Sequence, residues 1–207
     1  MADYGINFRD TSDYVTDGAG ETYCLGHTED EYPVTRGGLT FGWTTSGGLF
    51  AEGNRNSGVD ARFAGINEFV HSQGPATADF RVDLTGNITL RIAAGDYQYA
   101  NTPNTSIRDE VGEKIDLGII TTGTTDWHDG EGTVRTSIAD WISNNVAFSS
   151  YDFSGYVVVR MTADTGESGS AVIAHLFLSE DAADPTVPAL DEGMLVGGLQ
   201  PLAGGLA

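Results

Sequence analysis

The chain has 207 residues, of which 40% are hydrophobic, enough to bury the core of one large all-β domain or of two smaller ones. Thirty acidic residues outnumber ten basic ones and give a formal net charge of −20. No basic run interrupts this field, which argues against direct binding to DNA or RNA. The single cysteine, Cys24, excludes an intrachain disulfide and a cysteine-rich zinc site.

Alternating apolar and polar residues predict roughly ten short strands, with 28 glycines and six prolines to supply the turns. In chain order the expected strands are residues 4–8, 14–15, 22–25, 39–43, a short one near Ala61, 80–84, 88–92, 114–120, 133–136, 146–149, 155–162 and 171–178. Residues 137–142 are expected to form one helical turn, and no internal repeat is visible. The pattern predicts an all-β fold, and specifically a two-layer sandwich.

Two pairs of neighbouring strands are predicted to form hairpins. Residues 80–84 and 88–92 are separated by three residues, and their expected inward side chains are Phe80, Val82, Leu84, Ile88, Leu90 and Ile92. Residues 155–162 and 171–178 flank eight small, polar residues, which is typical of a hairpin with a long loop. Neither face of the strand at 171–178 is polar, so we expect it inside the sandwich.

The composition changes after Glu180, and we expect one domain over residues 1–180 and a separate segment over residues 181–207. This segment begins as a linker and ends as a glycine-rich apolar tail. Its apolar side chains are Met194, Leu195, Val196, Leu199, Leu202 and Leu206. The tail is either a terminus that frays or packs on its own domain, or a docking peptide that adds a strand to a neighbouring subunit.

The first ten residues lack the basic and apolar regions of a signal peptide, and no run of about 18 apolar residues predicts a membrane span. We therefore expect a protein that is made in a host cytoplasm and does not insert into a membrane. It would leave the cell only as part of a particle.

Several motifs resemble malectin-like and galactose-binding-like β-sandwich modules. They are Ile6-Asn-Phe-Arg, Thr40-Phe-Gly-Trp43, Val59-Asp-Ala-Arg-Phe-Ala-Gly-Ile66 and the strand at 80–84, and the resemblance extends over about residues 4–180. It implies a jelly-roll sandwich that binds sugars at its loop end. Single modules of this kind without a signal peptide also resemble virion proteins of tailed phages. The tail after Glu180 departs from the family pattern.

Sugar binding of this kind uses aromatic rings that stack on the apolar faces of sugars. Trp127 is the leading candidate because its neighbours in the sequence are polar, and Tyr97 and Tyr99 follow Gly95-Asp96 in a predicted loop. Trp43 ends a predicted strand and could reach the same rim. For each ring the alternative is that it packs beneath a loop.

A calcium site is a further hypothesis, with Asp126, Asp129 and Glu131 as oxygen ligands in a glycine-containing loop; otherwise no cofactor is expected. Catalysis has little support, because Gly166-Glu-Ser-Gly-Ser170 lacks the final glycine of a nucleophile elbow. Of the histidines, His27, His71 and His128 are expected in solvent.

The sequence therefore favours a non-enzymatic structural or accessory protein of a phage-like virion, either a capsid decoration protein or a tail or fibre component. Its expected partners are other virion proteins and further copies of itself, and surface glycans are a possible ligand. The alternative is a free-standing carbohydrate-binding module, and a glycan-active hydrolase is a weaker alternative.

Overall fold

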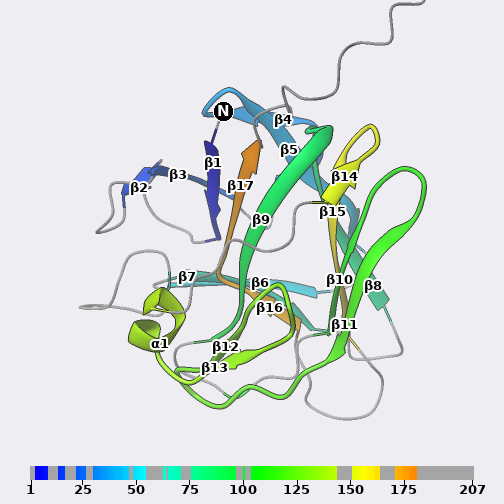
Figure 1. Cartoon of the computed structure of the whole chain (residues 1–207). Helices are drawn as coiled ribbons and strands as arrows, with labels where there is room; N and C mark the ends of the chain where they lie inside the picture. The colour runs from blue at the N-terminus through cyan, green and yellow to red at the C-terminus, as the bar shows by residue number, and fades with distance from the viewer. Residues whose placement is uncertain are drawn as a thin grey trace, which may run out of the picture.

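The computed structural model describes residues 3–8, 14–16, 22–26, 30–46, 49–54, 63, 65–70, 76–96, 100, 104–143, 151–163 and 171–180. These residues form three β-sheets and one short helix, α1 (Ile138–Ser143). The two larger sheets enclose a common hydrophobic core, so the predicted all-β sandwich is confirmed (Figure 1). No helix in the described part of the chain is long and apolar enough to cross a membrane.

The first sheet has eight strands, seven of them in one continuous row. The row is β13 (Val134–Arg135), β12 (Trp127–His128), β9 (Gly86–Gly95), β17 (His175–Glu180), β1 (Asp3–Asn7), β3 (Thr22–Leu25) and β2 (Tyr14–Thr16). The eighth strand, β14 (Tyr151–Phe153), pairs with the beginning of β9. Only β1 and β3 run parallel among the described pairs of this sheet, and Figure 1 shows β17 between β1 and β9.

The second sheet has six strands, and its outer face carries the candidate site. Its order is β11 (Glu113–Ile119), β10 (Asn104–Arg108), β15 (Val157–Ala163), β8 (Ala76–Val82), β5 (Leu39–Ser46) and β4 (Val34–Arg36). A third, three-stranded sheet contains β16 (Ala171–Ile173), β7 (Gly65–Val70) and β6 (Leu49–Asn54).

The main core lies between the two larger sheets and is built from the inward positions of their strands. All six side chains expected to face inward from residues 80–92 are buried there. An aromatic group occupies its centre: the Phe80 ring lies 5.0 Å from that of Phe8, 5.5 Å from that of Phe41 and 4.9 Å from that of Trp43, centroid to centroid. These four rings come from β8, β5 and the residue that follows β1.

A smaller core contains the Phe63 and Trp127 rings, 4.7 Å apart in an edge-to-face arrangement, together with Ile66, Ala93, Val172 and Ala174. Ile138 of α1 packs against it. This second core joins β9 and β12 to the three-stranded sheet.

Neither predicted hairpin forms. β8 and β9 belong to different sheets: β8 pairs with β5 and β15, whereas β9 pairs with β17, β12 and β14. The run at 171–178 divides at Ala174 into β16, which pairs with β7, and β17, which pairs with β1 and β9. The reason is that alternation determines which side chains face inward but not which strand lies alongside.

Other predicted elements agree within a few residues, including the strands at 114–120 and 133–136 and the helical turn at 137–142. The strand expected near Ala61 is β7, which begins at Gly65. The segment 146–149 lies outside the described residues, and the strand near it is β14. The tail, residues 181–207, also lies outside the described residues.

Candidate functional site

The outer face of the six-stranded sheet carries charged and aromatic side chains at the positions that alternate with its core residues. On β8 these outward positions are Asp79 and Arg81, with Asp83 just beyond the strand. On β15 they include Val158 and Arg160. Their inward neighbours, such as Phe80 and Val159, are fully buried, so the core holds these polar groups in place from below.

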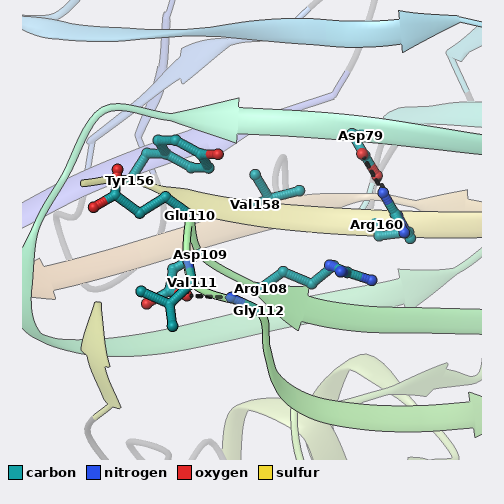
Figure 2. A pocket seen from close by; sticks show the side chains of 9 residues that line it. All are labelled: Asp79, Arg108, Asp109, Glu110, Val111, Gly112, Tyr156, Val158 and Arg160. Atoms are coloured by element: carbon teal, nitrogen blue, oxygen red, sulfur yellow. Dashed lines mark hydrogen bonds and ion pairs between the residues drawn. The ribbon is translucent and has the colours of Figure 1, made fainter. Parts of the chain in front are cut away.

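A polar hollow of about 250 Å³ opens on this face, and we call it the sheet-face hollow. Figure 2 shows it above β15, between the end of β8 and the turn that joins β10 to β11. Its lining residues are Asp79, Arg108, Asp109, Glu110, Val111, Gly112, Tyr156, Val158 and Arg160.

One end of the hollow is fixed by an ion pair between Asp79 and Arg160. The guanidinium donates Nε–H and Nη2–H to the two carboxylate oxygens of Asp79, and each nitrogen–oxygen distance is 2.6 Å. Asp79 stands directly opposite Arg160 in the register of β8 and β15, so each strand supplies one partner. The hydrogen bonds to Asp79 raise the pKa of Arg160 above its ordinary value, although partial burial opposes this. Arg160 therefore remains a cation.

Arg81 lies between two tyrosine rings further along the face. Its guanidinium carbon is 4.4 Å from the centroid of the Tyr32 ring and 4.1 Å from that of Tyr156. Asp83 accepts hydrogen bonds from Arg81 Nε at 2.8 Å and from the Tyr32 hydroxyl at 2.7 Å. The bond to Asp83 and partial burial raise the pKa of Tyr32. These contacts fix the Tyr156 ring at the edge of the hollow.

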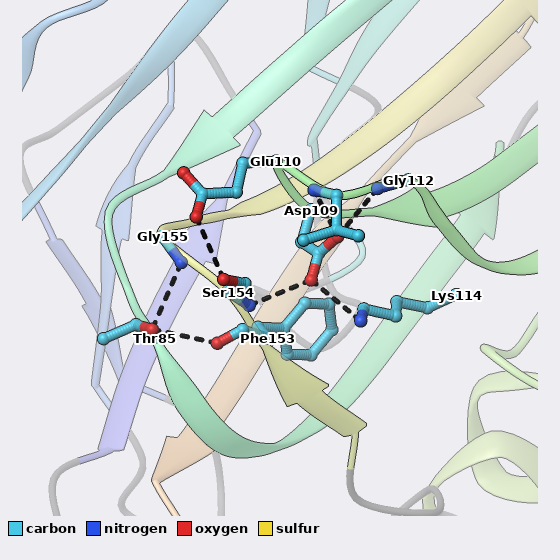
Figure 3. Close-up of polar contacts among 9 residues, drawn as sticks. Thr85, Asp109, Glu110, Gly112, Lys114, Phe153, Ser154 and Gly155 are labelled. Atoms are coloured by element: carbon cyan, nitrogen blue, oxygen red, sulfur yellow. Dashed lines mark hydrogen bonds and ion pairs between the residues drawn. The ribbon is translucent and has the colours of Figure 1, made fainter.

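The opposite wall is the turn that follows β10, and the Asp109 carboxylate holds it (Figure 3). The carboxylate has no exposed surface, and it accepts hydrogen bonds from the amides of Val111, Gly112 and Ser154 at 2.9–3.0 Å. Lys114 Nζ lies 2.8 Å from it. Burial alone would raise the pKa of Asp109, but the bonds from Lys114 and the three amides lower it well below its usual range.

We expect Asp109→Asn to destabilise the protein at pH 7, and the loss to shrink in acid. The folded-state pKa of Asp109 lies below the value of about 3.9 for an unfolded aspartate. Its charge therefore stabilises the fold above that pH, and this contribution disappears as the pH falls through about 4 toward the folded-state pKa. Urea unfolding at pH 7, 4 and 3 measures the difference. Glu131→Gln, at an exposed carboxylate, is the control. A difference that stays constant with pH would assign the effect to hydrogen-bond geometry instead of charge.

A second hollow of about 400 Å³ is lined by Glu31 and Tyr32, which precede β4, and by Trp43 and Thr44 of β5. Trp43 contributes little surface to it, because its side chain points inward from β5 and only 4% of the residue is exposed. Its ring packs against Phe80 and Phe8 in the main core. The position of Trp43 thus contradicts the prediction that it stacks on a sugar at the rim.

Trp127, the leading predicted sugar platform, is fully buried in the smaller core against Phe63. A ring without exposed surface cannot stack on a sugar in solvent, so this prediction is wrong. Trp127 lies on β12, a strand of only two residues that pairs with β9 and β13, so the residues around it in the sequence are polar although its own side chain is buried. Tyr97 and Tyr99 lie outside the described residues.

The three carboxylates proposed to bind calcium do not converge. Asp129 is buried, and it accepts bonds from the amides of Glu131 and Thr133 and from Arg135 Nε at 2.8–3.0 Å. Asp126 accepts the amide of Gly123 at 3.1 Å, and Glu131 is exposed. No group of three or more histidine, cysteine or acidic side chains in the described part of the chain is arranged to hold a metal ion. Asp129 instead closes its own loop.

His128 is also buried, contrary to the prediction that it faces solvent. Burial lowers the pKa of His128, although the Asp129 carbonyl, 2.9 Å from Nδ1, opposes this, so the imidazole is neutral and donates Nδ1–H to that carbonyl. His175 is buried on β17, edge-on to Phe63.

The residues of the sheet-face hollow were not predicted as a site. The available signal was charged residues at the outward positions of strands whose inward positions are strongly apolar. What the sequence lacked was the pairing of β10 with β15, which brings Arg108 beside residues some 50 positions later.

No protein-family model and no curated protein matches this sequence. Two solved structures are similar to this chain. Protein YxiM from Bacillus subtilis has a TM-score of 0.51 and 14% sequence identity over 87% of this chain and 40% of that one. The plant receptor-like kinase FER has a TM-score of 0.48 and 8% identity over 87% of this chain and 42% of that one. This chain thus spans about two fifths of each, and at such identity the likeness to YxiM supports a β-sandwich fold alone.

Proposed function

We propose that this chain is a non-enzymatic structural or accessory protein of a phage-like virion, and that its β-sandwich binds surface glycans. The sandwich would be a jelly roll of the malectin-like or galactose-binding-like kind, and the protein would act as a homo-oligomer on a capsid, tail or fibre. Neither nucleic acid nor a membrane is a partner in this proposal, because the charge of −20 repels phosphates and anionic lipids.

The observation that carries glycan binding is the sheet-face hollow. It combines guanidinium donors, the Tyr156 hydroxyl and the apolar side chain of Val158 on a rigid sheet. Sugars offer the complement of such a surface, because their hydroxyls accept and donate hydrogen bonds while their C–H faces pack on apolar groups.

The same hollow favours binding over hydrolysis. A glycosidase needs one carboxylic acid that donates a proton and one carboxylate that is available to the sugar or to water. Of the three carboxylates that line the hollow, only Glu110 is exposed, so a second carboxyl group for a glycosidase pair is missing. The Asp79 oxygens accept bonds from Arg160, and the buried Asp109 carboxylate accepts three amides and faces Lys114. The depressed pKa of Asp109 makes it a poor proton donor.

The observation that supports attachment to a particle is the composition of the tail, which is apolar and glycine-rich on an otherwise very acidic chain. We expect deletion of residues 189–207 to abolish incorporation into virions while sugar binding and the cooperative unfolding transition stay intact. Co-sedimentation of the tagged full-length and truncated chains with virions assembled in the same cells measures this. A truncated chain that sediments normally would contradict docking through the tail.

A free-standing carbohydrate-binding module is the second candidate. The sheet-face hollow supports it as well as it supports the virion protein, because both would bind glycans there. Full-length protein that binds a glycan array but never co-purifies with particles would select this candidate. Co-purification with virions and an empty glycan array would select a purely structural role.

A further inference from the structure

Arg108 is the charged residue of the sheet-face hollow with the most unused hydrogen-bonding capacity. Among the described residues its one charged partner is Glu113, with Arg108 Nη1 3.9 Å from the Glu113 carboxylate, which is longer than a hydrogen bond. The Arg108 side chain is 31% exposed. Its guanidinium carries five N–H donors in a planar fork, the geometry that matches a carboxylate.

Arg160 places a second guanidinium next to it. The register pairs Arg108 with Val158 and Ser106 with Arg160, so Arg108 and Arg160 are diagonal neighbours on one face of β10 and β15. Diagonal neighbours stand about 7–8 Å apart, within reach of two long side chains. Arg160 uses Nε and Nη2 for Asp79, which leaves Nη1 without a partner among the described residues. Figure 2 shows both side chains along the same side of the hollow.

Basic side chains concentrate on this sheet although the chain as a whole is strongly acidic. Five of its ten lysines and arginines lie on the six-stranded sheet, namely Arg36, Arg81, Arg108, Lys114 and Arg160. At physiological salt the field of distant carboxylates is screened over about 8 Å, whereas a guanidinium that touches a ligand is not. Four of these five cations are paired with a carboxylate at hydrogen-bond distance and Arg108 is the exception, so Arg108 is the cation of the hollow that an anion can contact without displacing a bound carboxylate.

We propose that the sheet-face hollow binds the carboxylate of an acidic sugar, with Arg108 as the main contact and Arg160 as the second. This assignment rests on the proposed glycan binding and names its ligand class. The Tyr156 hydroxyl, which has no hydrogen bond to another described residue, pairs with a sugar hydroxyl, and Val158 forms the floor beneath the ring.

An acidic peptide is a poorer match to the same surface. A peptide carboxylate would satisfy Arg108, but its aliphatic side chain would leave the Tyr156 hydroxyl without a partner. A sugar with both a carboxylate and hydroxyls serves both kinds of group at once.

The test compares oligogalacturonate with an α-1,4-linked galactose oligomer of equal length, because the two then differ only at C6, where a carboxylate replaces a hydroxymethyl group. Amide chemical shifts and calorimetry on the full chain at 0.15 M salt measure binding. We expect the acidic oligomer to bind about ten-fold more tightly, in line with a charge-assisted hydrogen-bonded pair, and to shift the amides of Ser106, Gly112 and Val158. Arg108→Gln should remove the ten-fold preference, and Arg108→Lys should restore part of it. The matched control is Arg91→Gln on the other large sheet, which should change nothing.

Each outcome is informative. Equal binding of both oligomers, unaffected by Arg108→Gln, overturns the acidic preference and leaves glycan binding in place. Shifts confined to residues away from the hollow overturn the site. Equally tight binding of a polyglutamate peptide overturns the ligand class, and no binding of either oligomer overturns glycan binding itself. Unchanged thermal unfolding of each variant shows that the fold is intact.

Discussion

Replacing Phe80 by alanine is expected to lower the free energy of unfolding by about 4 kcal/mol. Phe80 is fully buried at the centre of the aromatic group, with Phe8, Phe41 and Trp43 within 5.5 Å of its ring centroid. The substitution removes the apolar surface of the ring, leaves a cavity that the packed sheets cannot fill, and breaks three aromatic contacts. Urea unfolding followed by tryptophan fluorescence measures the loss.

Two control variants test whether the loss of stability comes from the cavity in the core. Phe80→Leu keeps most of the volume and should cost considerably less than alanine. Val111→Ala removes an apolar side chain that is 78% exposed and should change stability by less than about 0.5 kcal/mol. A Phe80→Ala protein as stable as the parent would show that the two large sheets do not share this core.

Gly95→Ala is expected to cost about 3 kcal/mol or more, because both backbone conformation and space forbid a side chain there. The φ angle of Gly95 is 151°, and a Cβ atom would lie 2.3 Å from the Asp126 carbonyl oxygen and 3.0 Å from the Trp127 Cα. Those are backbone atoms of the loop before β12 and of β12 itself, so relief requires β12 to move away from β9. Trp127 would then lose its packing against Phe63.

Gly86→Ala at the opposite end of β9 is the matched control. Its φ angle is 96°, but a Cβ atom there meets nothing within 4 Å. The control therefore carries only the strain of the backbone conformation, about 1–2 kcal/mol. The difference between the two variants measures the steric conflict, and equal losses would contradict the close approach of β9 and β12.

The sequence predicts which side chains of a strand face the core better than it predicts which strands pair with each other. Apolar residues at every second position identify Phe80, Val82, Ile88 and Leu90 as core residues, and all four are buried. The same pattern is silent on pairing, which is why β8 and β9 looked like a hairpin although they lie in different sheets. Pairing depends on contacts between residues far apart in the chain, and a single sequence does not display them.

The candidate site shows the same division. Trp127 lies on a strand of two residues, too short for a periodic pattern, so its polar neighbours suggested a loop and concealed a core residue. The sequence predicts the strand that carries Arg160 but not β10, which carries Arg108, and only the register of β10 against β15 places the two residues together. The sequence shows which residues carry charge, but it does not show which of them lie close together in the fold.

The Asp109 carboxylate also determines how the hollow opens. It holds the amides of Val111 and Gly112 on one turn and that of Ser154 on another, while Glu110 accepts the Ser154 hydroxyl at 2.9 Å. Releasing one turn therefore exposes the hydrogen-bonding groups of the other, so the two should exchange their amide protons as a single cooperative unit. A ligand that rests on the Val111 turn would slow exchange at Ser154 without touching it.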